Sequence, residues 1–332
     1  MKAAYITQTG DPDVIQFGDL PDPDPSAGQV LVRVEAVAVN PIDTYVRGGL
    51  VALELDFPYT IGCDLAGTIV ACGEDVERFA VGDRVWGSNQ GLMGRAGTFS
   101  ELAAVDEQWL YAAPEGVSSE VLAAGALVGL TAHLGLFLHA GVEAGDLVFV
   151  NGGTGGVGAA VVQLAKSAGA RVVATVGSSE KQELCSALGA DLAVDYHDPD
   201  MDTVLASFAA ENGGFDVWFE TLREPTPDRT IELMAKRGRI VVMAGRAARP
   251  EFPVGSFYTK DLRMCGFAMF NASDQEQRIC GEAINQLAAN GGWNPPIGAR
   301  FGLSESVTAH QLQQDNTIGG QGTLSGKIVL TP

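Results

Sequence analysis

The sequence predicts an α/β fold in which a β-rich domain accompanies a doubly wound parallel sheet. Three observations predict it. The 332 residues are enough for two hydrophobic cores. From Met1 to about Val105, short strand patterns are broken by Gly, Pro and Asp, as is typical of antiparallel sheet. From Gly145 to Gly245, strand and helix patterns alternate, as is typical of a parallel sheet covered by helices on both faces.

Each element is predicted from the spacing of its apolar residues, which is about two in a strand and about 3.6 in a helix. The predicted strands are Gln29–Val39, Gly67–Cys72, Gly82–Trp86, Gly145–Val150, Arg171–Val176, Asp216–Glu220, Arg239–Gly245 and Lys327–Thr331. The predicted helices are Val157–Ala168, Lys181–Leu188, Thr230–Ala235 and Gln275–Ala289. An earlier helix, capped by Ser118 or Ser119, continues through Ala126, and an apolar stretch follows it to His139.

The composition limits the partners and the location of the protein. Asp and Glu number 41 against 21 Lys and Arg, which gives a net charge of −20. This charge repels nucleic acids and anionic membranes, so we expect neither as a partner. No uninterrupted apolar run reaches the roughly 20 residues of a membrane helix, and no signal peptide is recognised. The five cysteines form no close pairs, which predicts reduced thiols, no clustered metal site and a cytoplasmic protein.

A glycine-rich segment provides the main functional signal. Phe149–Gly158 contains the pattern Gly-x-Gly-x-x-Gly at Gly153, Gly155 and Gly158, with Thr154, Gly156 and Val157 completing the loop. A predicted strand precedes it, a predicted helix follows, and a second strand closes the unit, which is the context of a Rossmann dinucleotide site. Glycines there allow a diphosphate to approach backbone amides at a helix start. A merely flexible turn is the alternative interpretation.

The end of the second strand of this unit predicts which dinucleotide binds. NAD-binding sites carry an acidic residue there that hydrogen-bonds the ribose 2′-hydroxyl. Here Gly177 and Ser178 leave room for a 2′-phosphate, Ser178 can donate to it and Lys181 can neutralise it, which favours NADPH. Glu180 would repel the phosphate if it pointed inward, and we expect it to face solvent at the helix start.

Several passages together resemble the medium-chain dehydrogenases and reductases, and within them the zinc-free quinone oxidoreductases and the zeta-crystallin-like proteins. The resemblance spans nearly the whole chain. It is carried by Asn40–Gly49, Gly62–Gly73 followed by Gly82–Val85, Gly129–Ala132, the glycine loop, Gly266–Phe270 and Gly322–Leu330.

The resemblance implies a GroES-like catalytic domain built from residues 1–124 and 266–332, with an NADP-binding Rossmann domain over 125–265 between them. It also implies a homo-oligomer, with homodimers and homotetramers both represented among relatives. By the resemblance, Asn40 and Tyr45 face the nicotinamide and the acceptor, and Thr131 contacts the nicotinamide end. Ser178, Lys181 and Tyr196 then bind the 2′-phosphate, while Gly245 and Arg246 line the cofactor.

The family comparison also implies that no zinc is bound. Zinc-dependent members have Cys where this chain has Asn40, and a His–Glu pair where it has Cys63 and Asp64. One soft ligand does not complete a tetrahedral site that needs three protein ligands. Cys63 is then expected to be a buried small residue, with a catalytic or redox-sensitive thiol as the alternative.

These features predict an enzyme that passes hydride or electrons from NADPH to a quinone. A quinone accepts hydride without a Lewis acid, so Tyr45 is expected to hydrogen-bond or protonate the developing oxyanion and Asn40 to orient nicotinamide ribose or acceptor. The alternatives are reduction of a 2-alkenal or enone, and a catalytically idle NADPH-binding sensor or structural protein. His133, His139 and His310 are expected to be satisfied structural or surface residues, and no Gly-x-Ser-x-Gly elbow indicates a hydrolase.

Overall fold

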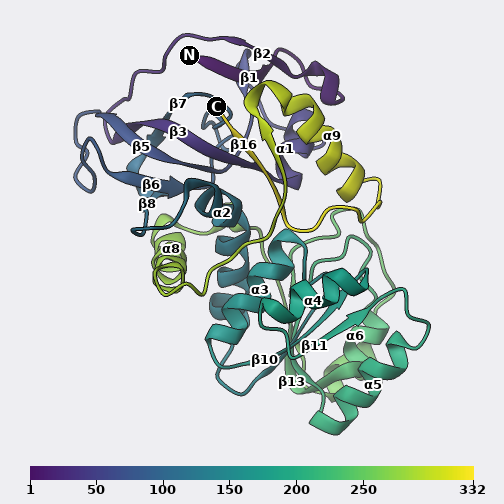
Figure 1. Cartoon of the computed structure of the whole chain (residues 1–332). Helices are drawn as coiled ribbons and strands as arrows, with labels where there is room; N and C mark the ends of the chain where they lie inside the picture. Colours follow the sequence, from purple (N-terminus) through teal and green to yellow (C-terminus); the bar gives the residue numbers. More distant parts are fainter. The chain divides into compact units, whose positions relative to one another are not determined.

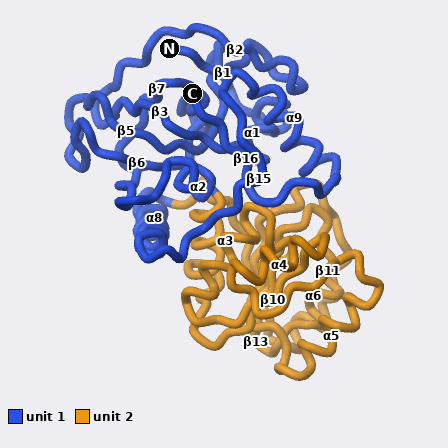
Figure 2. Tube along the Cα trace, viewed as in Figure 1, with its two compact units in different colours: residues 1–127, 273–332 blue, residues 128–272 orange.

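The computed structural model describes Met1–Pro332 and divides into two compact units (Figure 2). The first unit joins Met1–Leu127 to Ser273–Pro332, and the second is Val128–Ala272. Both ends of the chain therefore belong to one unit. The boundaries expected from the sequence, after residues 124 and 265, fall a few residues earlier, and the roles of the two units as catalytic and cofactor domains stay a prediction.

The first unit contains a seven-stranded sheet in the order β15-β16-β3-β5-β6-β8, with β7 paired to β3, and a small sheet β2-β1-β4 (Figure 1). All pairs but β15–β16 are antiparallel. Its strands are β1 (Lys2–Ile6), β2 (Gln16–Asp19), β3 (Gln29–Val39), β4 (Tyr59–Thr60), β5 (Leu65–Cys72), β6 (Arg84–Gly87), β7 (Leu102–Asp106), β8 (Leu110–Ala112), β15 (Ile297–Gly302) and β16 (Lys327–Thr331).

The helices of the first unit begin at recognisable caps. Helix α1 (Pro41–Arg47) begins with Asn40 as N-cap and Pro41 in its first turn. Helix α8 (Asp274–Ala289) begins with a capping box, because Ser273 Oγ accepts from the Glu276 amide and the Glu276 carboxylate accepts from the Ser273 amide. Helix α9 (Ser306–Thr317) follows β15.

The second unit contains a six-stranded parallel sheet in the order β11-β10-β9-β12-β13-β14, so the doubly wound fold is confirmed. Its strands are β9 (Leu147–Val150), β10 (Arg171–Val176), β11 (Leu192–Asp195), β12 (Phe215–Glu220), β13 (Met234–Val242) and β14 (Arg263–Gly266). Its helices are α3 (Gly156–Ser167), α4 (Ser179–Ala187), α5 (Met201–Asn212), α6 (Pro227–Leu233) and α7 (Val254–Thr259).

The core of the second unit is aromatic at its centre. Phe149 of β9 stacks on Trp218 of β12 with ring centroids 3.8 Å apart, and Phe215 packs against both rings. Each aromatic ring buries a large apolar area, so this cluster fixes β9 against β12. The two strands end beside each other at Val150 and Glu220.

One helix crosses from the first unit to the second and corrects an expectation. Helix α2 (Ser119–His133) continues into a π-helical turn, Leu134–His139, and the 21 residues have a mean hydropathy of 2.0 in their most apolar window. This segment is long and apolar enough to span a membrane, although the sequence showed no uninterrupted apolar run of about 20 residues. However, 78% of the window is buried inside the protein, as in the core helix of a globular fold.

Two further expectations were wrong in detail. The strand predicted over Arg239–Gly245 starts earlier, at Met234, and ends at Val242. The helix predicted over Thr230–Ala235 therefore ends at Leu233, because Met234 is the first residue of β13.

Candidate active site and cofactor site

A buried polar cluster lies where β3, α1 and β16 meet in the first unit. We call Asn40, Asp43, Cys63, Asp64 and Lys327 the Lys327 cluster. Each of these residues is at most 3% exposed. Strand β16 pairs with β3, with Ile328 opposite Val39, and this register places Lys327 beside the end of β3. The Lys327 ammonium donates to the Val39 carbonyl at 2.7 Å and to Asn40 Oδ1.

Asp64 is the acidic partner in this cluster. Its carboxylate accepts from Asn40 Nδ2 at 2.7 Å, from Ser88 Oγ at 2.6 Å and from the Leu127 amide at 3.2 Å. Lys327 Nζ lies 4.0 Å from Asp64 Oδ2. Burial raises the pKa of Asp64 and lowers that of Lys327, while their mutual attraction opposes both shifts. The hydrogen bonds and the opposite charge together compensate the cost of burying this ion pair.

Asp43 and Cys63 form the second half of the cluster. Asp43 Oδ2 accepts from the Asn40 amide at 2.7 Å, and the Cys63 thiol hydrogen-bonds the same carboxyl. Burial raises the pKa of Asp43 to about 7, and the charge of Asp64 adds to that shift. Burial, followed by the charge of Asp43, raises the pKa of Cys63 well above that of a free thiol. Cys63 is therefore a protonated thiol at neutral pH, which makes it a poor nucleophile.

The cluster does not fit a zinc ion. Asn40 and Asp64 are engaged with the Lys327 ammonium, a positive charge that would repel a metal cation. No three His, Cys, Asp or Glu side chains of the chain are grouped so that they could hold a metal ion. Both amide hydrogens of Asn40 also have acceptors, Asp64 Oδ2 and the Ala38 carbonyl at 3.3 Å. Contact of Asn40 with nicotinamide ribose or acceptor stays a prediction.

Helix α1 holds Tyr45 between two fixed ends. Its N-terminus is anchored by the Lys327 cluster. At its C-terminal end, buried Arg47 donates to the Gly10 carbonyl at 3.2 Å and to Gln314 Oε1 of α9. Tyr45 is partly exposed between these anchors. A phenol on a rigid, partly open helix face can donate a hydrogen bond to a bound ligand.

The first unit has a cavity of 180 Å³ between two loops. One loop follows α1 and the other follows β6. The cavity combines apolar side chains with Tyr59, Arg95 and the carboxylates Glu54 and Asp56. Tyr59 donates to the Gly91 carbonyl and so links the two loops. The lining residues are Leu53–Asp56, Pro58–Thr60 and Gly91–Ala96.

His310 was expected to be a satisfied or surface residue, and this was wrong. It is fully buried, and neither ring nitrogen has a hydrogen-bond partner. Its ring meets the edge of Phe99 with centroids 5.8 Å apart. Burial, helped by the charge of Arg47, lowers its pKa to about 3, so the imidazole is neutral at physiological pH.

In the second unit, the glycine loop joins β9 to α3 with a tightly packed backbone. Gly152 has a φ of +65°, a left-handed conformation that favours glycine. The Gly153 amide donates to the Thr175 carbonyl of β10 at 2.8 Å. A Cβ atom on Gly158 would lie 2.1 Å from the Gly152 carbonyl oxygen, so only glycine allows helix and loop to approach this closely. The loop is therefore a constrained turn and not a flexible one.

The start of α3 can receive an anion. Gly155 is its N-cap, no side chain caps the first turn, and no acidic residue lies in that turn. The first amides of a helix lack intrahelical partners, and the helix dipole favours negative charge there. Val157 is partly buried at this end, and Thr154 is buried in the loop. The arrangement fits a cofactor diphosphate.

The residues predicted to contact a 2′-phosphate come together after β10. Ser178 is the N-cap of α4 and accepts from the Lys181 amide at 3.3 Å. Tyr196 packs so closely on Gly177 that a Cβ there would lie 2.3 Å from its hydroxyl. Glu180 is exposed as expected, but its carboxylate accepts from Ser178 Oγ at 3.1 Å. The Ser178 hydroxyl, which was expected to donate to the phosphate, therefore already donates to the Glu180 carboxylate.

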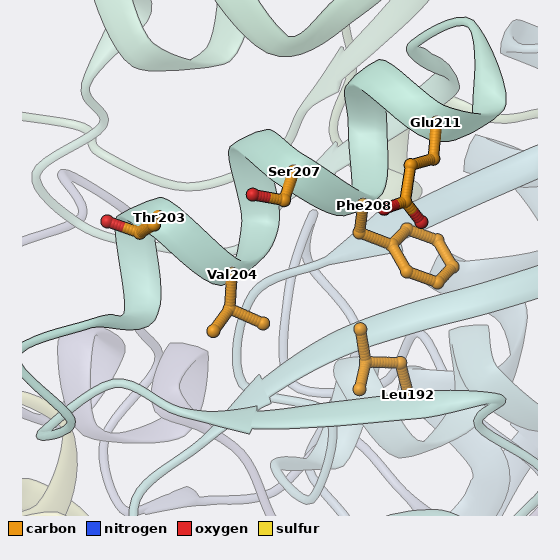
Figure 3. A pocket seen from close by; sticks show the side chains of 6 residues that line it. All are labelled: Leu192, Thr203, Val204, Ser207, Phe208 and Glu211. Carbon is orange, nitrogen blue, oxygen red and sulfur yellow. The ribbon is translucent and has the colours of Figure 1, made fainter.

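The remaining predicted residues are placed separately. Gly245 has a φ of +81° and lies in the loop after β13, followed by exposed Arg246. Thr131 is buried within α2. A hollow of 400 Å³ lies between α5 and the first residue of β11 (Figure 3). It offers no basic group, only the carboxylate of Glu211, two hydroxyls and apolar carbon, so it does not suit an anionic dinucleotide.

Comparison with known proteins agrees with both units. Residues 26–115 match the family model described as "Alcohol dehydrogenase GroES-like domain", and residues 156–285 match "Zinc-binding dehydrogenase". The chain is 30% identical to the quinone oxidoreductase of Homo sapiens over 99% of this chain and 97% of that protein. It is 34% identical to a 2-methylene-furan-3-one reductase of Solanum lycopersicum over 76% of this chain and 64% of that protein.

Solved structures of similar fold cover the whole chain. A structure of an NAD-dependent alcohol dehydrogenase has a TM-score of 0.88 at 30% identity, with all of both chains covered. A mycobacterial protein complexed with NADPH has a TM-score of 0.84 at 29% identity, again with all of both chains covered.

Proposed function

Because the chain belongs to the medium-chain dehydrogenases and reductases, and within them to the quinone oxidoreductase family, we propose that it reduces a quinone with NADPH and without zinc. Its class as an oxidoreductase and its cofactor NADPH follow from the family and from NADPH-complexed structural relatives. The observation that supports the cofactor site is the constrained glycine loop before an uncapped helix start.

The second unit supplies the groups that would hold NADPH. Gly153, Gly155, Gly156 and Gly158, with Thr154 and Val157, would receive the diphosphate at the start of α3. Ser178, Lys181 and Tyr196 would bind the 2′-phosphate beside Gly177. Exposed Arg246 after Gly245 adds a positive charge, and Thr131 would contact the nicotinamide end. Positive charge at this site is needed because the whole chain carries a net charge of −20, which would otherwise repel the anionic cofactor.

The reaction that we propose needs little from the protein besides orientation and a proton donor. When bound, NADPH supplies a hydride, and a quinone accepts it without a Lewis acid. Tyr45 would donate a hydrogen bond, and then a proton, to the oxygen on which negative charge develops. Asn40 and Lys327 would act within the protein by fixing the start of α1, and therefore the position of Tyr45.

The cavity between the loops after α1 and β6 supports an uncharged acceptor. Its leucine and methionine side chains suit the face of a planar ring, and Arg95 offers a hydrogen-bond donor. Loops of this kind can differ in sequence without disturbing the sheet, so they are where acceptor choice is expected to reside.

Steady-state kinetics tests the proposal. We expect the purified protein to oxidise NADPH with 1,4-benzoquinone and to prefer NADPH over NADH. The site is tested by Gly158→Ala, which would force the Gly152 carbonyl away and should abolish measurable NADPH binding. Gly255→Ala, where a Cβ meets nothing within 4 Å, is the matched control and should bind NADPH normally. If G158A binds NADPH as tightly as the control variant, the glycine loop is not part of the cofactor site.

Reduction of an enone is the second candidate, because the tomato relative is named as a reductase of a methylene-furanone. Both acceptors take hydride at an electron-poor conjugated system. Parallel assays with 1,4-benzoquinone and a 2-alkenal separate them by their kcat/KM values. Tight NADPH binding without turnover of either acceptor would favour the idle sensor or structural role instead.

We further propose a cytoplasmic homo-oligomer, with a homodimer as the simplest form. Strand β14 is an edge of the parallel sheet, and Met264 within it is 41% exposed. An open edge with an exposed apolar side chain can pair with a second copy. Light scattering of the purified protein tests this, and a monomer at micromolar concentration would contradict it.

A further inference from the structure

Glu220 is a buried carboxylate at the carboxyl end of β12 that no catalytic step uses. It is 2% exposed. Oε1 accepts from Asn151 Nδ2 at 2.9 Å and from the Leu222 amide at 2.8 Å, and Oε2 accepts from Trp218 Nε1 at 3.2 Å. Burial raises its pKa, while these hydrogen bonds and then the charge of Arg229 oppose that shift. Its hydrogen-bond donors are all neutral groups, and these bonds set its position.

Asn151 connects Glu220 to the glycine loop. It follows β9 directly, and its side-chain Oδ1 accepts from Thr175 Oγ1 of β10 at 3.2 Å. Thr175 Oγ1 in turn accepts from the Gly152 amide at 3.1 Å, and the Thr175 carbonyl accepts from the Gly153 amide. The Asn151 carbonyl accepts from Thr221 Oγ1 at 2.8 Å. A continuous chain of hydrogen bonds therefore runs from Glu220 to the first two residues of the loop.

The location of this chain of hydrogen bonds has a consequence for binding. Strands β10, β9 and β12 are neighbours in the sheet, and the direction of strand order reverses between β9 and β12. In open parallel sheets, ligands bind outside the carboxyl ends of the strands at this reversal. The Asn151–Glu220 hydrogen bond joins the two sides of this reversal, at the residue that precedes the loop that we assign to the cofactor diphosphate.

We propose that Glu220 is a positioning residue for NADPH, which acts through Asn151 and Thr175 and does not touch the cofactor. Its carboxylate fixes the Asn151 carboxamide, and the Asn151 and Thr175 side chains fix the entry of the loop at Gly152 and Gly153. The amides at the start of α3 then already have their binding orientation before the diphosphate arrives. Binding therefore costs less conformational entropy. This inference rests on the proposed cofactor site.

A matched pair of variants on β12 tests the inference. Glu220→Ala removes the acceptor for Asn151, while Asp216→Ala removes a carboxylate that accepts from the Leu147 amide at 2.8 Å, at the opposite end of the same two strands. We expect E220A to raise the Kd for NADPH about tenfold or more, because a buried donor loses its partner. We expect D216A to lose comparable thermal stability and to keep the wild-type Kd.

Glu220→Gln separates the hydrogen bond from the charge. Glutamine keeps one acceptor oxygen for Asn151 and Leu222 and loses the acceptor for Trp218 Nε1, which is not part of the connection to the loop, so E220Q should bind NADPH within about twofold of wild type. The KM for the acceptor should be unchanged in all three variants that fold. A loss of affinity in E220Q as large as in E220A, or the same loss in D216A, would overturn the positioning role.

Thr175→Val decides the question if E220A does not fold. Valine has the shape of threonine but cannot accept from the Gly152 amide. We expect T175V to weaken NADPH binding, whereas D216A, which also leaves a backbone amide without its side-chain acceptor, keeps the wild-type Kd. Wild-type affinity in T175V, or in a folded E220A, overturns the inference while the proposed function stands. Failure of the unmodified protein to bind NADPH overturns the proposed function itself.

Discussion

Lys327, in the last strand, donates a hydrogen bond to the side-chain oxygen of Asn40, which lies 287 residues earlier in the chain. The same ammonium faces Asp64 at 4.0 Å. These contacts tie the C-terminal strand to the residue that caps α1. The position of Tyr45 on that helix therefore depends on a residue at the far end of the sequence.

Lys327→Met should destabilise the protein strongly, because it leaves Asp64 buried without its opposite charge. We expect the free energy of unfolding in urea to fall by about 3–5 kcal/mol. The double variant D64N/K327M removes both charges and should recover part of that loss. Lys2→Met, which breaks the exposed Lys2–Asp19 pair, is the control and should leave stability nearly unchanged, because solvent screens that pair. K327M as stable as K2M would show that the buried pair contributes nothing.

Asp43 should make stability depend on pH. Burial raises its pKa from 3.8 to about 7, so between these values the folded protein holds a proton that the unfolded chain has released. Its contribution is therefore fully present below about pH 4 and is lost as pH rises to about 7, by roughly 4 kcal/mol at most.

Asp43→Asn isolates this contribution, since other buried groups titrate in the same range. The stability of D43N relative to wild type should rise steadily between pH 4 and pH 7 and then level off, as measured by urea unfolding at each pH. Parallel curves for the two proteins would mean that Asp43 is not shifted.

Glu180→Gln should increase the preference for NADPH over NADH. The Glu180 carboxylate accepts from Ser178 Oγ, so it competes with a 2′-phosphate and repels it. Removing an exposed like charge should raise the ratio of kcat/KM for NADPH over NADH by about three- to tenfold, chiefly through KM for NADPH. Lys181→Ala should lower the same ratio. An unchanged ratio in E180Q would mean that the carboxylate swings away when the cofactor binds.

Tyr45→Phe should separate proton donation from cofactor binding. Loss of the hydroxyl should lower kcat with the quinone by about 100-fold, the usual effect of removing a general acid. The Kd for NADPH should change little, because phenylalanine keeps the ring and loses only the hydroxyl that we assign to the acceptor oxygen. Wild-type kcat in Y45F would assign the proton to another donor.

Local signals in the sequence predicted most of the second unit. The strands β9 and β10 and the helix α3 follow from apolar periodicity and a glycine pattern within one short stretch, so nothing distant had to be known. Strand β11 and helix α5 were missed. The strand has only four residues, and α5 buries only Leu205 and Ala209, which leaves no clear apolar stripe.

The polar clusters could not be predicted in the same way. Lys327 meets Asn40 only because β16 pairs with β3, and Glu220 meets Asn151 only because β12 lies beside β9. Strand pairing between distant segments is decided by the whole fold and not by either segment alone. Side-chain orientation is similarly non-local, since an isolated helix start gave no indication that Glu180 turns back to Ser178.

We propose that this chain binds NADPH at its glycine loop and passes hydride to an electron-poor acceptor. The most direct measurement is NADPH titration of the purified protein followed by NADPH oxidation with 1,4-benzoquinone. The structure predicts saturable NADPH binding that G158A abolishes, and turnover that stops when the quinone is omitted. Absence of binding to NADPH and NADH alike, with no oxidation by quinone or enal, would contradict it.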